Sequence, residues 1–243
     1  MYKKVIIAIH SVSENTLSSC RLERYLNIMK RLGYKFVSID QILSPTFENS
    51  RMIALTVDDA YKCCITNLMP ILQKYNIPAL MFVPTGLLAL QANDNNLIKN
   101  ECYKNEATMS VDDINHWLKN GFSIGFHCHN HLDLYNATNI HEIETDFEAG
   151  MKVLKENHWD SPYFAYPKGF LPKNRVHFQN LLIKYNFTHA FTINWGEVNT
   201  GEVFYINRVC LGNRENLLWS IMKTIGLGDF YFYKKKIYKE QTI

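Results

Sequence analysis

Residues 52–83 read MIALTVDDAYKCCITNLMPILQKYNIPALMFV and place two apolar runs on either side of a segment of helix length. The runs 52–57 and 79–83 have the length of buried β-strands, whereas residues 63–77 have the length of a helix. A helix that joins two consecutive strands of one sheet leaves those strands parallel. This stretch therefore predicts a parallel β-sheet covered by helices.

The same alternation continues on both sides of this stretch. Further strand-length apolar runs lie at 4–9, 35–39, 122–126, 163–166, 188–192 and 204–211, and segments of helical period lie at 18–34, 110–121, 139–158 and 174–186. Repeated strand–helix units of this kind predict an α/β fold whose parallel sheet is closed as a barrel or left open. We expect one domain over residues 1–243, with its active site at the carboxyl ends of the strands.

Composition excludes several classes of protein. The chain has 243 residues, of which 47% are hydrophobic and 20% charged, as in an ordinary globular protein. A formal net charge of +3 is too small to indicate a nucleic-acid partner. No stretch approaches the ~20 apolar residues of a membrane span.

The amino-terminal apolar run, Val5 to Ile9, is shorter than the roughly 7–15 residues of a secretory signal. The six cysteines show no C-x-x-C spacing, so we interpret them as free thiols. We therefore expect a cytoplasmic protein, with secretion only if a leader has been removed.

Two segments fall outside the alternation. Residues 91–110 are rich in Asn and lack a period, which predicts a surface excursion near the substrate. The tail from about residue 226 is aromatic and basic. We interpret it as a carboxyl-terminal helix with a frayed end, and peripheral contact with an anionic membrane is the alternative.

The chain contains two adjacent pairs of aspartates. Asp112 and Asp113 follow a Ser at the expected start of a helix, where carboxylates favour the helix dipole and need no further function. Asp58 and Asp59 instead follow the strand 52–57 directly. Neighbouring carboxylates repel unless a cation or proton lies between them, so this pair predicts a functional site.

Three histidines, His127, His129 and His131, follow the strand 122–126. Two histidines and one carboxylate form a three-ligand set that leaves positions open for water and substrate, as in catalytic metal sites. A second carboxylate beside the ligand could act as general base. Since His129 would face away on an extended stretch, we interpret it as a bystander.

Together these segments resemble the polysaccharide deacetylases of carbohydrate esterase family 4. The segments that carry the resemblance are ALTVDDAY, NLMPILQKYNIPALMFVPTG, GFSIGFHCHNHLDL and FAYPKGF, and it runs from about residue 4 to 211. It implies a distorted (β/α) barrel of about seven parallel strands and metal-dependent hydrolysis of an N-acetyl group on an amino sugar. The segment VIIAIHSV is similar to the front of the branch that deacetylates poly-N-acetylglucosamine.

The resemblance implies roles for particular residues. Asp58 would be the general base, and Asp59, His127 and His131 would hold a divalent metal, most simply zinc, with Ni, Co, Fe or Mn as alternatives. His10 would be the general acid that protonates the leaving amine.

The sequence departs from the family pattern at several positions. The glycine after the Asp pair is Ala60, and the Ser or Thr after the first metal histidine is Cys128. Ala165 stands where most members have the arginine that orients the base, and we expect Arg208 to supply that charge. A purely structural salt bridge is the alternative for Arg208.

Lys168 stands where an aromatic residue is usual. Its backbone N–H could stabilise the oxyanion, and its ammonium group could meet an anionic part of the substrate. We also expect substrate contacts from Tyr166, Pro167 and Trp195.

Two other functions share the same residues. Two histidines and a carboxylate also occur in non-haem iron oxygenases, although these usually sit in a β-sandwich and carry H-x-D, which this sequence lacks. A non-catalytic carbohydrate-binding relative is the second alternative. The amino sugar, and whether it is monomeric, nucleotide-linked, lipid-linked or polymeric, is left open.

Overall fold

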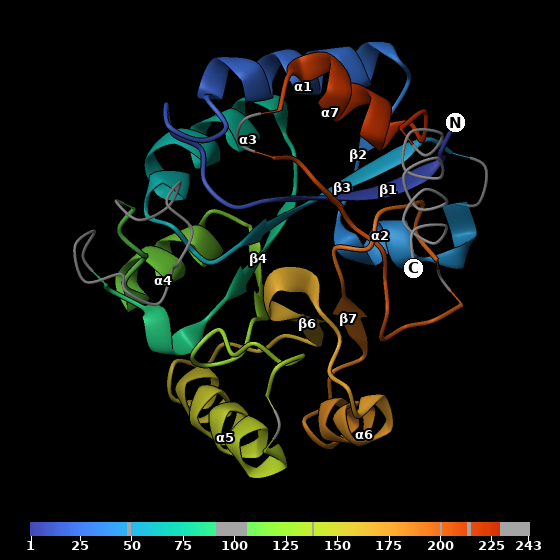
Figure 1. Ribbon diagram of the computed structural model, residues 1–243. Helices are drawn as coiled ribbons and strands as arrows, with labels where there is room; N and C mark the ends of the chain where they lie inside the picture. The colour runs from blue at the N-terminus through green and yellow to red at the C-terminus, as the bar shows by residue number, and fades with distance from the viewer. Residues whose placement is uncertain (48–49, 91–105, 138, 200, 213–214, 229–243) are drawn as a thin grey trace, which may run out of the picture.

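The computed structural model describes residues 1–47, 50–90, 106–137, 139–199, 201–212 and 215–228 (Figure 1). The strands are β1 (Lys4–Ile9), β2 (Lys35–Phe36), β3 (Met52–Asp58), β4 (Ala79–Val83), β5 (Ser123–Phe126), β6 (Tyr163–Ala165), β7 (His189–Phe191) and β8 (Val209–Cys210). The α-helices are α1 (Ser19–Arg31), α2 (Ile39–Leu43), α3 (Met69–Tyr75), α4 (Val111–Lys119), α5 (Ile140–Glu156), α6 (Arg175–Lys184) and α7 (Leu217–Thr224). A π-helical turn, Cys64–Leu68, runs directly into α3.

All pairings between these strands are parallel, in the order β7-β6-β5-β4-β3-β1-β8. β2 pairs with the beginning of β3, at Met52 and Ile53, while β4 pairs with its later part, from Leu55 to Asp58. In Figure 1 the strands occupy the centre and the helices surround them. The predicted distorted α/β barrel of about seven parallel strands is confirmed.

The segment before and within β8 brings the two ends of the sheet together. Ile206 forms a parallel bridge with Phe191 of β7, and three residues later Val209 pairs with Ile7 of β1. The backbone N–H of Arg208, between them, donates to the Asn194 carbonyl at 3.1 Å. One short stretch of chain therefore contacts both edges, which makes the closure irregular and holds Arg208 inside the barrel wall.

The interior of the barrel is filled by alternate residues of each strand. Ile6, Ala54, Phe82, Ala165 and Phe191 belong to one buried cluster, whereas their sequence neighbours pack outward against the helices. This double burial explains why the strands read as continuous apolar runs.

The same alternation determines which polar residues face the interior. Counting in steps of two from Ile6 leads to His10, and from Ala54 to Asp58. Gly125 faces Phe82, since a Cβ there would lie 2.5 Å from that ring, and the next inward position on its strand is His127. The side chains of His10, Asp58 and His127 thus converge at the carboxyl end of the barrel.

Within the described ranges, no helix has the length and apolar character needed to cross a membrane.

Candidate metal centre

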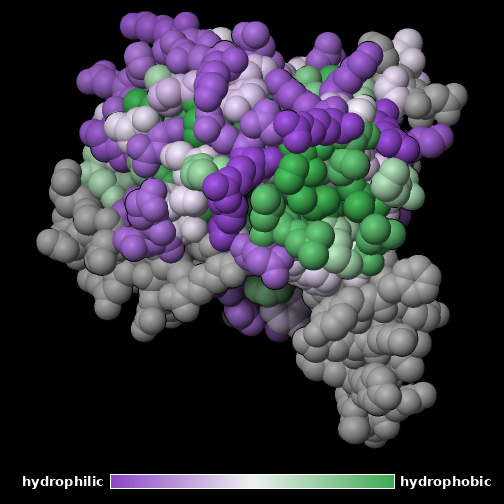
Figure 2. All heavy atoms as spheres, turned by 90° about the horizontal axis from the view of Figure 1, so that it is seen from above, coloured by the Kyte–Doolittle hydropathy of each residue, from purple (hydrophilic) through white to green (hydrophobic). Residues whose placement is uncertain are grey.

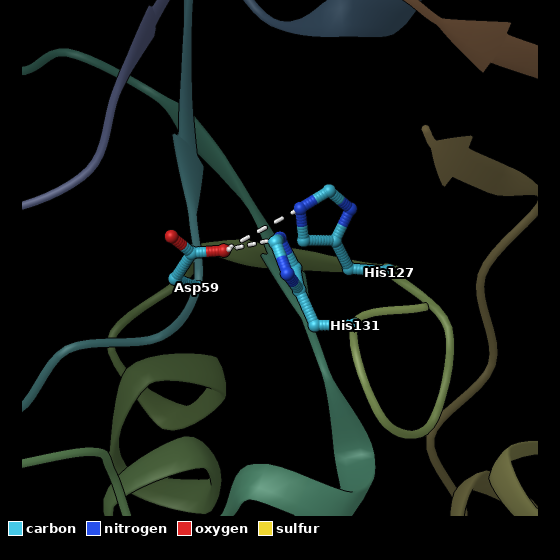
Figure 3. Close-up of side chains that lie close together, drawn as sticks. All are labelled: Asp59, His127 and His131. Atoms are coloured by element: carbon cyan, nitrogen blue, oxygen red, sulfur yellow. Dashed lines mark ion pairs between the residues drawn. The ribbon is translucent and has the colours of Figure 1, made fainter. Parts of the chain in front are cut away.

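Asp59, His127 and His131 form a compact group at the carboxyl ends of β3 and β5 (Figure 3). The Asp59 Oδ1 atom lies 3.5 Å from Nε2 of His127 and 3.3 Å from Nε2 of His131. The ligand atoms of all three residues lie within 4.8 Å of one another. The two-histidine, one-carboxylate set predicted from the sequence is therefore assembled.

This geometry fits a divalent cation. Tetrahedral zinc with bonds of about 2.0–2.1 Å separates its ligand atoms by about 3.3 Å, close to the distances from Asp59 to the two imidazoles. The Asp59 Oδ1 atom is buried and has no hydrogen-bond partner among the described residues. Since buried carboxylate oxygens are normally satisfied, this atom and the two ring nitrogens form a donor set suited to a metal.

Left-handed backbone conformations change the direction of the chain after β3 and after β5. Asp59 and Ala60 have φ angles of 70° and 52°, and Cys128 and His131 have φ angles of 61° and 51°. Such conformations are uncommon outside glycine and concentrate at functional sites. The positive φ of Ala60 gives a physical reason for the glycine that the resemblance leads one to expect there.

Backbone and side-chain partners fix the orientation of the histidine loop. The Nδ1 atom of His127 donates to the Ala165 carbonyl at 2.7 Å, which leaves its Nε2 lone pair directed at Asp59. Asp146 of α5 accepts hydrogen bonds from the backbone N–H groups of His129, at 2.7 Å, and Asn130, at 2.9 Å. Partners of this kind hold metal ligands in position.

The ring of His129 makes a hydrogen bond to Thr85, with 3.0 Å between Nδ1 and Oγ1. It is not part of the candidate metal group. Its interpretation as a bystander agrees with this placement, whereas the structural role of Asp146 was not predicted.

Asp58 forms a buried pair with Arg208. The guanidinium Nη1 donates to Oδ1 at 2.7 Å and Nη2 donates to Oδ2 at 2.8 Å. Arg208 is fully buried, and its remaining donors reach the Thr192 carbonyl and the Thr56 hydroxyl. Its guanidinium carbon also lies 5.1 Å from the centre of the Phe82 ring. The structure thus places the Arg208 guanidinium against Asp58, as expected of the residue that supplies the charge.

The two carboxylates are held in the ionised form. Burial alone would raise the pKa of Asp58, but the charge of Arg208, helped by His127 and His10, outweighs burial and lowers it. Burial would also raise the pKa of Asp59, but the imidazoles of His131 and His127 lower it well below its usual range. Both groups are therefore available as anions for a cation or a proton.

His10 lies beside this group. It follows Ile9, which pairs with Val57, so the same register places His10 level with Asp58. Burial would lower the pKa of His10, but a hydrogen bond with Cys210 and the charges of Asp59 and Asp58 raise it well above its usual range. His10 is thus placed to carry a proton at the site.

The residues predicted to bind substrate around 166–168 differ in exposure. Tyr166 is buried, and its hydroxyl donates to the Phe204 carbonyl at 3.0 Å. Pro167 is buried as well, whereas the Lys168 side chain is exposed and forms an ion pair with Asp133 at 2.7 Å. Lys168 has a φ angle of 57°, so its peptide is turned out of the regular backbone. Only Lys168 of these three presents its side chain to solvent.

Trp195 lies against α7. Its ring contacts that of Trp219 edge-on at 5.9 Å, and its Nε1 donates to the Lys223 carbonyl at 3.3 Å. It is outside the Asp–His–His group, and its role in substrate binding stays a prediction. Of the segment 91–110, which was expected near the substrate, residues 91–105 lie outside the described residues. The same holds for residues 229–243 of the tail that begins at about 226.

Fold and site together define a parallel α/β barrel with a candidate two-histidine, one-carboxylate centre at the carboxyl ends of its strands. A family model described as polysaccharide deacetylase matches residues 48–186, which is more than half of the chain. The chain therefore belongs to the polysaccharide deacetylase family.

Solved structures share the fold over most of their length. IcaB from Ammonifex degensii is 21% identical, with a TM-score of 0.71 over 87% of this chain and 92% of that one. The Streptococcus pyogenes deacetylase PplD, in complex with acetate, is 20% identical, with a TM-score of 0.71 over 91% and 97% of the two chains. A de-N-acetylase from Aggregatibacter actinomycetemcomitans is 19% identical, with a TM-score of 0.70 over 88% and 96%. No curated protein matches the sequence.

Proposed function

We propose that this protein is a metal-dependent hydrolase that removes an N-acetyl group from an amino sugar in a glycan or glycan precursor. The observation that carries the proposal is the convergence of a candidate metal group and the ion-paired Asp58 at one end of a polysaccharide deacetylase barrel. No specific observation favours either alternative function. The parallel barrel is unlike the β-sandwich of the iron oxygenases, and the assembled Asp–His–His group gives no reason to prefer a non-catalytic carbohydrate-binding protein.

Asp59, His127 and His131 would hold the cation, for which zinc is our first choice. When bound, such a cation lowers the pKa of a coordinated water and polarises a carbonyl oxygen. The buried Asp59 Oδ1, which has no hydrogen-bond partner among the described residues, and the Nε2 atoms of the two histidines supply the oxygen and nitrogen donors that zinc accepts.

The chain's other residues would move and stabilise charge. Asp58 would take a proton from the water that attacks the acetyl carbon, while Arg208 keeps the carboxylate ionised and fixed in direction. The Lys168 N–H would donate a hydrogen bond to the carbonyl oxygen as it becomes negative. His10 would donate its proton to the nitrogen as the C–N bond breaks, giving acetate and a free amine.

The amino sugar is proposed at the level of class. The sequence around His10 is similar to the poly-N-acetylglucosamine branch, and solved structures of the same fold include a protein named as a de-N-acetylase. These likenesses favour a substrate with N-acetylated amino sugars, in which the exposed Lys168 would meet an anionic neighbour. A cytoplasmic location also stays a prediction.

Acetate release tests this function. Zinc-loaded protein would be incubated with N-acetylated monosaccharides, nucleotide sugars and short oligosaccharides, and acetate would be measured enzymatically. We expect release from at least one member, its loss on chelation and its return on addition of a divalent metal. Absence of release with every metal and substrate, or oxygen-dependent turnover by the iron-loaded protein, would contradict the proposal.

A further inference from the structure

The loops that follow β5 and β6 expose two aromatic side chains at the carboxyl end of the barrel. Tyr135 is 50% exposed and Phe170 is 54% exposed. Their ring centroids lie 6.4 Å apart, and the ring planes meet at 55°. No other Phe, Tyr or Trp side chain that the structure describes is exposed. Neighbouring exposed rings, unlike scattered single ones, indicate a contact with a ligand.

Both rings are close in sequence to the candidate metal centre. Tyr135 comes four residues after His131, a member of the metal group. Phe170 comes five residues after Ala165, whose carbonyl accepts the hydrogen bond from His127. The two histidines and the loop that joins them are drawn in Figure 3. Both loops therefore lead outward from the metal centre to the exposed rings.

Polar contacts hold the two loops together. The Lys168 ammonium group forms an ion pair of 2.7 Å with Asp133, which joins the loop after β6 to the loop after β5. Asp133 also accepts from the backbone N–H of Asn136 at 3.2 Å, which fixes the turn that carries Tyr135. Tyr135 and Phe170 therefore form one surface that is arranged in advance, which we call the aromatic platform.

The chemistry of the aromatic platform favours a sugar. The C–H groups on one face of a pyranose ring carry small positive charges, and this face packs against the negative face of an aromatic ring. The hydroxyl groups of the same sugar need polar partners, which Asp133 and Lys168 offer beside the rings. A purely apolar partner would instead bury this ion pair away from water, which costs free energy.

We propose that Tyr135 and Phe170 bind a second sugar of the substrate, next to the amino sugar that loses its N-acetyl group at the metal centre. This inference rests on the proposed function for the role of the metal centre. It deepens that function by assigning the substrate to glycans of two or more sugars. A monosaccharide would occupy the centre alone and leave the aromatic platform without a ligand.

Acetate release from N-acetylglucosamine and from its tetrasaccharide, measured on the zinc-loaded protein, tests the proposal. Substitution of both Tyr135→Ala and Phe170→Ala should raise KM for the tetrasaccharide about tenfold, because stacking stabilises the bound substrate. The effect should fall on KM rather than on kcat, and on the tetrasaccharide rather than on the monosaccharide. Tyr135→Phe in place of Tyr135→Ala should restore part of the loss, since it returns the ring.

Leu227→Ala is the matched control. Leu227 is 52% exposed, much as Phe170 is, but it lies just beyond α7. The Ile225 carbonyl accepts from the Tyr2 N–H at 3.1 Å, so α7 ends beside the amino-terminal end of β1. Figure 2 looks down on the side of the molecule where α7 lies and shows hydrophobic side chains exposed there as well. The control should have the wild-type KM for the tetrasaccharide, because it changes exposed apolar surface at the end of the barrel away from the metal group.

Binding without turnover separates this inference from the proposed function. Protein freed of metal by chelation would be mixed with the tetrasaccharide, and NMR saturation of aromatic protons would be detected on the sugar C–H protons. We expect transfer from the wild-type protein and its loss in the double variant. That result, together with no acetate release from any substrate, would support the aromatic platform and contradict the proposed function alone.

Four results would overturn the aromatic platform. They are the absence of transfer from the wild-type protein, equal transfer from the wild type and the double variant, equal KM values of these two proteins for the tetrasaccharide, and a dimer in solution that the double variant abolishes.

Discussion

The guanidinium of Arg208 donates two parallel hydrogen bonds, of 2.7 and 2.8 Å, to the carboxylate of Asp58, although the two residues are 150 positions apart in the sequence. The pair is fully shielded from solvent and lies beside Asp59, the carboxylate of the candidate metal group. Bidentate pairing fixes the plane of the carboxylate as well as its charge. The adjacent aspartates thus have different partners, Arg208 for the first and two imidazoles for the second.

Asp58→Asn should retain the metal and lose activity. Asparagine keeps the shape of the side chain but cannot take a proton, so we expect the rate of acetate release to fall by about 10²–10⁴-fold. Zinc stoichiometry should be that of the wild type, because Asp58 is outside the Asp–His–His group. A variant that deacetylates at nearly the wild-type rate would show that Asp58 is not the base.

Arg208→Met should destabilise the fold. The substitution leaves Asp58 buried without its partner, and the free energy of unfolding should fall by about 3–5 kcal/mol. Arg175→Met, which removes an exposed arginine, is the matched control and should change it by less than about 1 kcal/mol. Equal urea midpoints for the two variants would argue against a structural contribution from the buried pair.

Asp146→Asn should weaken metal binding without removing a ligand. Asp146 accepts two backbone N–H groups of the histidine loop, and an asparagine amide would turn one of these contacts into a donor–donor clash. We expect zinc affinity, measured by competition with a chromophoric chelator, to fall about 10–100-fold. Glu148→Gln, an exposed change on the same helix, should leave the affinity unchanged, and equal affinities for both variants would contradict this role.

The metal-free protein should lose stability as the pH rises above neutral. The pKa of His10 is raised in the folded state, so its contribution is complete below the unfolded value of about 6.5 and is lost as the pH rises through the folded value. His10→Gln should remove this part of the dependence in urea unfolding across a pH series. The same alkaline decline in wild type and variant would assign it to other groups.

The main features of the fold and site could be predicted because each depends on local pattern. Strands buried on both faces leave continuous apolar runs, and ligands of a parallel-sheet site follow those runs directly. Asp58, Asp59, His127 and His131 all satisfy this rule, and three of the four form the candidate metal group.

Other features depend on contacts that leave no local signal. Asp146 lies on the buried side of α5 with Ile143 and Phe147, but its partners are backbone N–H groups of the histidine loop, which the sequence around it does not identify. The carbonyl that orients His127 belongs to the backbone of Ala165, so a residue of any type at position 165 would supply it. The burial of Thr224 in α7 depends on a hydrogen bond with Tyr25, which is 199 residues away in the sequence.

Zinc K-edge X-ray absorption, on protein loaded with one equivalent of zinc, tests the metal centre most directly. We predict nitrogen and oxygen ligands at about 2.0–2.1 Å with the outer scattering of imidazole, and loss of this signal in Asp59→Ala and His131→Ala. A sulfur ligand at about 2.3 Å, or a spectrum unchanged in both variants, would show that the metal binds elsewhere and would contradict the assignment of Asp59, His127 and His131.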